Sequence, residues 1–462
     1  GISEGHQFTP DVLYRIPSKM EDFYSSQGFI NAHIENRLKI NYKEGTVEIT
    51  FIIQENNKAV IQEIEITGNK ITKKSVIERE LSFHLGEAVD FFKFSQTQKK
   101  LYGLGIFNAV SIDYTPLKQE LKKKSGSVYI KPFKVHVRVE EFQPYFLRYG
   151  AQYDTETGFG GVAELDRRNL FGRAVEAGLS IKANIMEQDA RAFLQTPYLL
   201  GTRIDTNLFG FAAQKEEPDF TTRRLGASLQ QQKVLQRKFV ITYNYTFEHL
   251  RNLAGKIPLP QTRYNIGRVS FSLSRDSREN IFNSLKGSFI SLTGEYAEKL
   301  LASDVRYLRF FGQYFIYRLI RRSLTYAVGL RVGIGQGLGE DLVPSERFFA
   351  GGSSSLRGFD YHEVGPKNPL TGNPQGGNAV FILNQELRFP IYKIFSGVVF
   401  LDTGNVYPLI SDFDPLDIRE TAGFGLRLDL GFALARMDLG FKLDRLAGEP
   451  LYQIHFSLGQ AF

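Results

Sequence analysis

Alternation of apolar and polar residues dominates the chain from about residue 141 onward. The segments 175–185, 239–248, 424–431 and 437–444 each place an apolar residue at every second position, and most residues between them are charged, Ser, Thr, Asn or Gly. Successive side chains of a β-strand point to opposite faces, so each segment has one apolar and one polar face. The pattern therefore predicts an all-β region with two chemically different sides.

Membrane-spanning strands explain this pattern better than a soluble β-sandwich, which also alternates. The segments run about 9–11 residues, the length of a tilted strand that crosses a bilayer. They recur over the 321 residues from 142 to 462 without a second helical layer, and their polar faces carry charges at mid-strand, as in a wet lumen. At about 20 residues per strand and turn, we expect a transmembrane barrel of roughly 16 antiparallel strands, an even number as in single-chain bacterial barrels.

The first 141 residues combine helical and strand patterns and are expected to form α+β modules. Residues 58–141 predict the element order β-α-α-β-β, with Thr72 and Asp90 as candidate helix caps. Residues 1–57 predict a helix over 18–27 that stops at Gly28, then two strands, without the first strand of such a module. We therefore expect a partial module at 1–57, a complete module at 58–141 and the barrel at 142–462.

Composition and charge exclude several classes of protein. The absence of Cys excludes a disulfide scaffold, a thiolate metal site and a Cys nucleophile. We find no apolar stretch long enough for a membrane-spanning helix, and residues 1–8 do not resemble a signal peptide. The net charge is +7, and 16 Lys in residues 1–141 give way to 27 Arg afterwards, although neither part is strongly basic. We expect no nucleic-acid partner, and an Arg-rich barrel that holds charges in its lumen or meets lipid phosphates.

The sequence contains no convincing catalytic, cofactor or metal site. The seven His residues are scattered without ligand spacing. The glycines of 333–339 do not complete a dinucleotide fingerprint. Asp402 lies in an Asp-Thr-Gly segment like that of aspartic proteases, but those enzymes need two such carboxylates and this chain has one copy. We expect no enzyme activity, no cofactor and no metal.

One long segment, residues 336–376, does not fit a plain pore. A loop of about 40 residues is usually functional or disordered. This one contains Gly-Gly at 351–352 and Leu-Arg-Gly-Phe at 356–359, which favours a tight tip. The alternative is an exposed loop whose Arg is solvated. Because buried charges need partners, we hypothesise that the loop folds into the lumen and that Arg357 docks on Asp402, which lies on an otherwise apolar strand.

These motifs resemble those of the BamA/TamA family of outer-membrane assembly proteins, whose relatives include two-partner secretion transporters. The resemblance covers nearly the whole chain. It is carried by the loop motif Leu356-Arg357-Gly358-Phe359, the strand motif Phe400-Leu401-Asp402, the turn motif Asp166-x-x-Asn169-Leu170-Phe171-Gly172, and a C-terminal assembly signal with Phe456, Gly459 and Phe462. In that family the Asp of the strand motif binds the loop Arg. The final aromatic residue here is Phe, where Trp is common in the family.

The resemblance implies α+β domains of the polypeptide-transport-associated (POTRA) type in the periplasm, followed by an all-β barrel of about 16 antiparallel strands. It places the barrel in the outer membrane of a Gram-negative-type bacterium. It implies a foldase and insertase rather than an enzyme, which inserts nascent β-barrel proteins without nucleotide energy. The implied partners are unfolded outer-membrane clients, periplasmic chaperones, accessory lipoproteins or a TamB-like partner, and outer-membrane lipids.

The first and last barrel strands are expected to meet at a weak lateral seam. Pro144 precedes the first strand and Gly459 lies in the last, and both residue types weaken ladder pairing. A free strand edge can take up a client strand by β-augmentation. We further expect Arg357→Ala to leave a folded barrel with impaired assembly. The candidate seam residues are Tyr145, Leu147 and Tyr149 on the first strand and Tyr452, Ile454, Phe456 and Gly459 on the last.

Three other functions remain open. A TamA-like assembly protein for autotransporters is one of them, since the Phe-Phe-Ala-Gly-Gly run at 348–352 looks TamA-like whereas Met20-Glu21-Asp22 looks BamA-like. A two-partner secretion pore would have a helix in its lumen and would conduct ions. A passive diffusion porin would leave the POTRA modules and the Arg loop unexplained.

Overall fold

The computed structural model describes residues 7–118, 122–123, 129–199, 201–217, 219–235, 238–253, 263–281, 283–321, 323–430 and 434–458. The chain divides into two compact units, Gly1–Tyr145 with Arg167–Val175 and Phe146–Asp166 with Glu176–Phe462. In these described ranges, no helix is both long and apolar enough to cross a membrane.

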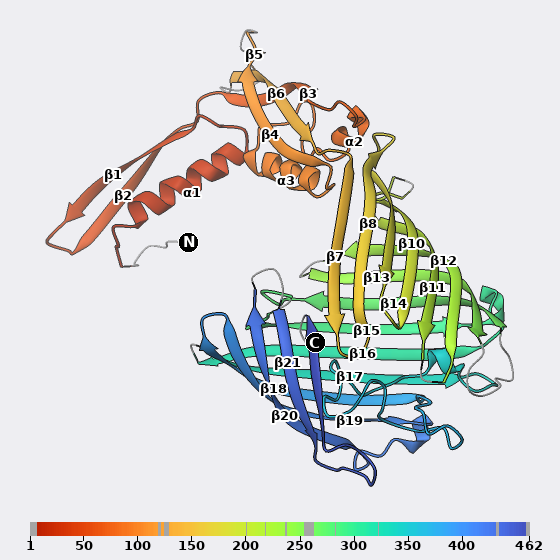
Figure 1. Cartoon of the computed structure of the whole chain (residues 1–462). Coiled ribbons are helices and arrows are strands. Elements are labelled where there is room, and N and C mark those ends of the chain that lie inside the picture. Colours follow the sequence, from red (N-terminus) through yellow and green to blue (C-terminus); the bar gives the residue numbers. More distant parts are fainter. Residues whose placement is uncertain are drawn as a thin grey trace. The chain divides into compact units, whose positions relative to one another are not determined.

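The first unit consists of α+β elements (Figure 1). In chain order they are α1 (Val12–Ser26), β1 (His33–Asn41), β2 (Thr46–Gln54), β3 (Lys58–Thr67), α2 (Lys74–Glu78), α3 (Phe91–Tyr102), β4 (Phe107–Pro116), β5 (Lys122–Lys123) and β6 (Tyr129–Glu141). β1 and β2 form a hairpin, and β6 lies between β3, its parallel neighbour, and β4, its antiparallel neighbour. The predicted α+β character and the order β-α-α-β-β are confirmed, with the short β5 added.

A hydrophobic core joins the helices and the sheet of 58–141. Ile61 of β3, Ile77 of α2, Leu101 of α3, and Val135 and Val137 of β6 are fully buried in it. Each such burial stabilises the fold by about 1.5–3 kcal/mol relative to an exposed side chain. Because the core draws on every major element, the module folds as one unit.

Two local expectations about the helices are wrong. Helix α1 begins at Val12, well before residue 18, and includes Pro17, although it ends as predicted just before Gly28, whose φ is +93°. Thr72 does not cap α2, because its hydroxyl and its N–H both donate to the carboxylate of Glu141. A charged acceptor forms the stronger hydrogen bond, so Thr72 ties the start of α2 to the end of β6 instead.

The N-terminus of α3 has the predicted cap and offers a test of it. Asp90 accepts a hydrogen bond of 2.8 Å from the N–H of Phe92. We expect Asp90→Ala to destabilise this unit by about 1 kcal/mol, and Asp90→Asn to cost less because Asn keeps the acceptor. Pulse proteolysis of the full chain with trypsin, which can cut after Lys99 and Lys100 once α3 unfolds, measures the difference. Equal resistance of the parent and both variants would contradict the capping role.

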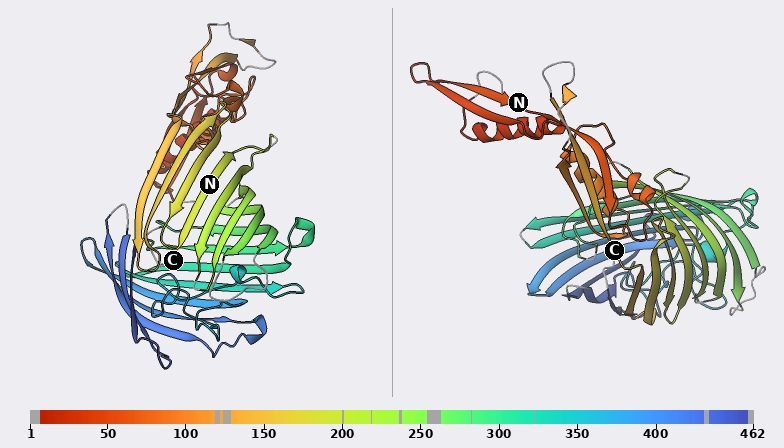
Figure 2. Two further views of the ribbon diagram at one scale, coloured as in Figure 1. Left: turned by 45° about the vertical axis from the view of Figure 1, so that its right-hand side comes forward. Right: turned by 90° about the horizontal axis from the view of Figure 1, so that it is seen from above.

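The second unit is a closed β-barrel, and Figure 2 shows its curved strands in two further views. The strands follow one another in chain order around the barrel, and β22 closes on β7. The predicted barrel of about 16 antiparallel strands is confirmed. Within the described residues the sixteen strands are β7 (Tyr145–Asp154), β8 (Gly158–Leu170), β9 (Val175–Ala183), β10 (Glu187–Thr196), β11 (Asp205–Glu216), β12 (Thr221–Val234), β13 (Phe239–Leu253), β14 (Arg263–Asp276), β15 (Gly287–Ala297), β16 (Tyr307–Arg321), β17 (Leu324–Gly337), β18 (Ala379–Tyr392), β19 (Phe395–Tyr407), β20 (Arg419–Asp429), β21 (Leu434–Lys442) and β22 (Tyr452–Leu458).

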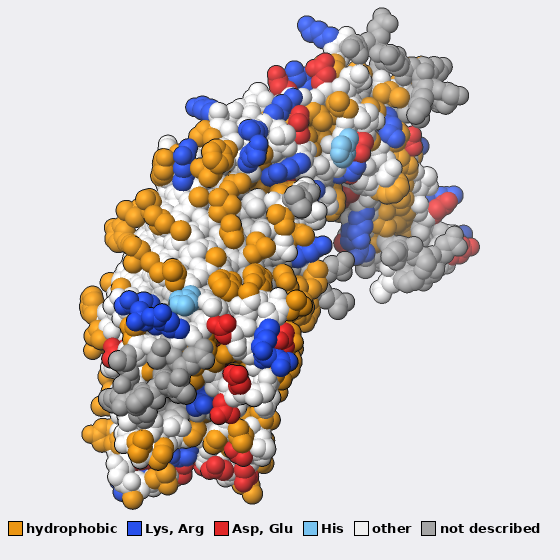
Figure 3. Space-filling view, turned by 90° about the vertical axis from the view of Figure 1, so that its right-hand side faces the viewer, with side chains coloured by type: hydrophobic (Ala, Val, Ile, Leu, Met, Phe, Trp, Pro, Cys, Tyr) orange, Lys and Arg blue, Asp and Glu red, His pale blue; other side chains and the backbone are white. Residues whose placement is uncertain are grey.

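Alternation along the strands sorts side chains between the lumen and the outer surface. On β21, Arg436, Asp438 and Lys442 are buried on the inner face, whereas Met437 points outward and is exposed. Figure 3 shows apolar side chains gathered over the outer surface of the barrel strands. An apolar outer band around a polar interior is the arrangement that a lipid bilayer requires.

Candidate functional site

The connection between β17 and β18, residues 338–378, is called the lumen loop below. It contains a short 3-10 helix (Pro344–Glu346) and the bridges Phe348–Gly377, Ala350–Val364 and Lys367–Pro374. The apolar residues of its motif are fully buried: Leu356 and Phe359 pack with wall residues Val380, Ile382 and Val406 of β18 and β19. The segment that the sequence predicts to fold inward thus lies against the inner wall of the barrel.

Glycines allow the tip of the lumen loop to approach the wall closely. Gly351 and Gly352 have φ of +110° and +105°, which L side chains rarely adopt. A Cβ on Gly352 would lie 2.6 Å from a carboxylate oxygen of Glu156. A Cβ on Gly358 would lie 2.5 Å from the methyl carbon of Thr421. The loop can therefore take this path only with glycine at these positions.

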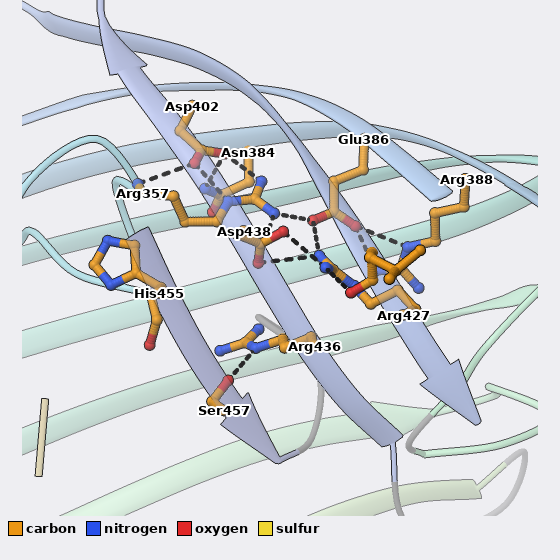
Figure 4. Close-up of polar contacts among 12 residues, drawn as sticks. Arg357, Asn384, Glu386, Arg388, Asp402, Arg427, Arg436, Asp438, His455 and Ser457 are labelled. Carbon is orange, nitrogen blue, oxygen red and sulfur yellow. Dashed lines mark hydrogen bonds and ion pairs between the residues drawn. The ribbon is translucent and has the colours of Figure 1, made fainter. Parts of the chain in front are cut away.

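Arg357 is fully buried and docks on Asp402, as the sequence led us to hypothesise (Figure 4). Its Nε and Nη2 donate to the two carboxylate oxygens of Asp402, each at 2.7 Å, and its backbone N–H donates to the same group at 3.1 Å. The guanidinium lies over the ring of Phe400, 3.6 Å from its centroid. This bidentate, stacked geometry is specific to Arg and unavailable to Lys.

Two further carboxylates complete the surroundings of Arg357, and the sequence reasoning missed both. Its Nη1 donates to Glu386 of β18 and lies 4.0 Å from Asp438 of β21. Glu386 also pairs with Arg388, and Asp438 with Arg427, each at 2.7 Å. Both acids lie at lumen-facing positions of their strands, which is the signal that could have identified them. This network, the arginine anchor, contains three arginines and three carboxylates among the described residues.

A second anchor holds the start of the lumen loop, and it too was missed from the sequence. Its polarity is opposite, because here the loop supplies the acid and the wall supplies the arginines. Glu346 is nearly fully buried and accepts hydrogen bonds from Arg224 of β12 at 3.1 Å and from Arg309 of β16 at 3.2 Å. Arg224 and Arg268 also donate to the buried Glu248, and Arg309 donates to Glu295. In the part of the wall that the structure describes, this glutamate anchor again balances three arginines with three carboxylates.

The junction of β22 and β7 is sparsely paired. In the described parts of the two strands, one register pair joins them, Ser457 with Asp154. The N–H of Thr155 donates to the carbonyl oxygen of Phe456 at 3.0 Å, and the rings of Phe456 and Tyr153 are 6.0 Å apart. By contrast, β12 and β13 are paired from Thr221–Leu253 to Val234–Val240. The barrel thus closes at a junction with few backbone hydrogen bonds between the described residues of its two strands.

The predicted seam residues lie on these two strands, but the structure does not bring them all together. Tyr452, Ile454 and Phe456 are on β22, and Phe456 contacts the end of β7. Tyr145, Leu147 and Tyr149 are exposed on the earlier part of β7, away from the pair Ser457–Asp154. The predicted seam and assembly-signal residues Gly459 and Phe462 lie outside the described residues. The register explains the difference, because β22 meets β7 at Asp154 rather than at Tyr145.

The acidic residues of the site are occupied by arginines rather than arranged for metal binding. In the described ranges, no group of three or more His, Asp or Glu residues could hold a metal ion. The Asp-Thr-Gly segment contains Asp402, whose two oxygens both accept from Arg357. Its geometry suits docking of the loop.

Comparisons with known proteins agree with this architecture. Residues 169–462 match the Omp85 superfamily domain, and 1–56 and 59–141 match the surface antigen variable number repeat of the POTRA type. The chain is 22% identical over 472 residues to the outer membrane protein assembly factor BamA of Nitratidesulfovibrio vulgaris, covering 99% of this chain and 58% of that protein.

Solved structures share the fold. BamA from Haemophilus ducreyi lacking POTRA domains 1–3 aligns with a TM-score of 0.81 at 19% identity, over 99% of this chain and 95% of that one. CdiB from Acinetobacter baumannii aligns with a TM-score of 0.57 at 15% identity, over 99% and 83%. These matches confirm the resemblance found in the sequence: the chain belongs to the Omp85 superfamily.

Proposed function

We propose that this outer-membrane protein is a BamA-like assembly factor that inserts nascent β-barrel proteins through the junction of β22 and β7. The observation that carries the proposal is the sparse pairing of β22 with β7 among the described residues, compared with the long registers of β12–β13 and β21–β22. The names of relatives that share the fold support the same function. The chain spans 58% of the length of the first of these relatives, so its activity and partners belong to this proposal.

A weak junction supplies what insertion of a client strand requires. If β22 separates from β7, each strand presents unpaired backbone N–H and C=O groups. A client strand can pair with these groups whatever its side chains, because β-augmentation relies on the main chain. The buried lumen loop leaves little reason to regard the barrel as an open diffusion pore. The proposed process needs no catalytic residue and no cofactor.

The proposal includes the surroundings of the protein. POTRA modules in the periplasm of a Gram-negative-type bacterium would receive unfolded clients from chaperones. Accessory lipoproteins or a TamB-like partner would complete the assembly complex. Exposed apolar residues on β22 and β7, such as Leu147 and Ile454, would face lipid where the client enters.

A disulfide across the junction tests the proposal. Continuing the register of Ser457–Asp154 places Tyr153 opposite Leu458, and opposed residues lie within disulfide range. The chain contains no Cys, so Tyr153→Cys with Leu458→Cys forms a defined bond. We expect the oxidised protein in proteoliposomes to lose most of its ability to assemble an unfolded barrel client, and reduction to restore it.

The matched control places a disulfide at a fully paired junction. Ala227 and Phe247 are register partners on β12 and β13, and locking them should leave assembly unchanged. If the locked β7–β22 junction also leaves assembly unchanged, insertion does not occur there. A two-partner secretion pore, the alternative suggested by the CdiB fold, would export its partner through the lumen with the junction locked.

A further inference from the structure

One carboxylate, that of Glu156, contacts both the lumen loop and the last strand of the barrel. Glu156 lies on the turn between β7 and β8, outside the two strands. Its side chain is almost completely buried. It belongs to neither anchor of the lumen loop, and none of the sequence motifs includes it.

The turn that carries Glu156 is held by the residue that closes the barrel. Asp154 accepts hydrogen bonds from the N–H groups of Glu156 at 2.9 Å and Thr157 at 2.6 Å. This is an Asx turn, which fixes the backbone two residues on. Asp154 is also the register partner of Ser457 on β22. The position of Glu156 is thus fixed by the same residue that pairs with the last strand.

On one side, Glu156 binds the tip of the lumen loop. Its Oε1 accepts a hydrogen bond from the backbone N–H of Ser353. A Cβ on the preceding residue, Gly352, would collide with this carboxylate. Four residues after Ser353, Arg357 is held in the arginine anchor. The carboxylate therefore meets the loop only when the loop tip is docked.

On the other side, Glu156 binds the last strand. His455 Nδ1 lies 3.3 Å from the same oxygen, Oε1, and the His455 side chain is almost completely buried. Burial alone would raise the pKa of Glu156, but the contacts with His455 and the Ser353 N–H lower it below its usual value. The group is therefore charged at neutral pH, and a buried charge that loses a partner is costly.

We propose that Glu156 is a positioning residue that makes closure of the β7–β22 junction depend on the docked lumen loop. One oxygen serves both contacts, so a docked loop holds the carboxylate where His455 can reach it. When the loop tip withdraws, the carboxylate is free to turn away, and β22 loses a polar contact at a junction where the described residues make few others. The inference rests on the proposed function for its purpose, because a junction that opens is what insertion requires.

The rate of disulfide formation in the Tyr153→Cys/Leu458→Cys chain, without any client, tests this coupling. Gln keeps an acceptor but removes the charge, and a hydrogen bond to a charged group exceeds a neutral one by about tenfold in an equilibrium. We therefore expect Glu156→Gln to slow disulfide formation by about tenfold. His455→Gln should act in the same direction. Glu164→Gln is the matched control, because Glu164 is a carboxylate on the same hairpin that pairs with Arg148 of β7.

A double-mutant cycle separates coupling from simple weakening. Arg357→Gln should slow disulfide formation when Glu156 is present and add little in the Glu156→Gln background. Independent, multiplying effects of the two substitutions would overturn the proposal, as would a Glu156→Gln rate equal to that of the parent or of Glu164→Gln. Heat-modifiable migration on a gel verifies that each variant is a folded barrel. The disulfide-formation assay uses no client, so its result does not depend on the outcome of the client-assembly assay.

Discussion

Replacement of Arg357 by alanine is expected to release the tip of the lumen loop and to have the largest effect of any single substitution in the barrel. Arg357 is fully buried among Asp402, Glu386 and Asp438. Removing one partner of a buried ion pair typically costs about 3–5 kcal/mol, because the remaining charge stays buried without compensation. The wall strands remain paired along their length, so a folded but less stable barrel should result.

The midpoint temperature of heat-modifiable gel migration measures the effect of Arg357→Ala. Arg357→Lys should give a smaller but distinct loss, because Lys keeps the charge but cannot form the bidentate contact. Arg347→Ala is the control, since Arg347 lies in the same loop and donates to the carbonyl oxygen of Leu342. Client assembly should fall in Arg357→Ala. A midpoint and an assembly rate equal to those of the control would show that the arginine anchor does not hold the loop.

Replacement of Glu346 by glutamine is expected to have the second largest effect. It leaves Arg224, Arg268 and Arg309 with two carboxylates instead of three. The excess buried cation should destabilise the docked loop by roughly 2–4 kcal/mol, less than full truncation because Gln still accepts a hydrogen bond. Faster trypsin cleavage within the lumen loop should report the change.

A compensating substitution makes this second prediction specific. In the absence of the Glu346 charge, Arg268–Glu248 and Arg309–Glu295 remain as close pairs, and Arg224 is the excess cation. Glu346→Gln combined with Arg224→Gln should therefore recover part of the lost stability. Glu340→Gln, at an exposed position of the same loop, is the control. If the double variant is less stable than Glu346→Gln alone, charge balance is not what holds this end of the loop.

Local periodicity was sufficient to predict the barrel, because alternation is set by the strand itself. It also marked Asp402 as a candidate partner for Arg357, since that acid shares one strand face with Phe400 and Gly404. Local periodicity failed where a residue distant in sequence determines which hydrogen bond a side chain forms. Glu141 comes from the far end of its module, and its carboxylate takes the hydroxyl of Thr72 away from the helix.

The remaining parts of the site depend on how the barrel closes. Glu386 and Asp438 lie on wall strands, whereas Glu346 lies in the lumen loop itself. Each meets its arginine partners only when strands far apart in sequence come together around the loop. The register of the closing pair, Ser457 with Asp154, is likewise a property of the ring rather than of either strand. The roles of Gly459 and Phe462 remain predictions from the sequence.

The opposite polarity of the two anchors makes the stability of the barrel depend on correct insertion of the lumen loop. A barrel whose loop stays outside lacks Arg357 beside Asp402 at one place in its wall and lacks Glu346 beside Arg224 and Arg309 at another. Only insertion in the native direction supplies both partners, since a reversed loop would set Arg357 against the arginines and Glu346 against the carboxylates. An unfinished or wrongly finished copy is therefore the less stable form. The charged residues that line the lumen therefore favour the barrel whose loop has been inserted correctly.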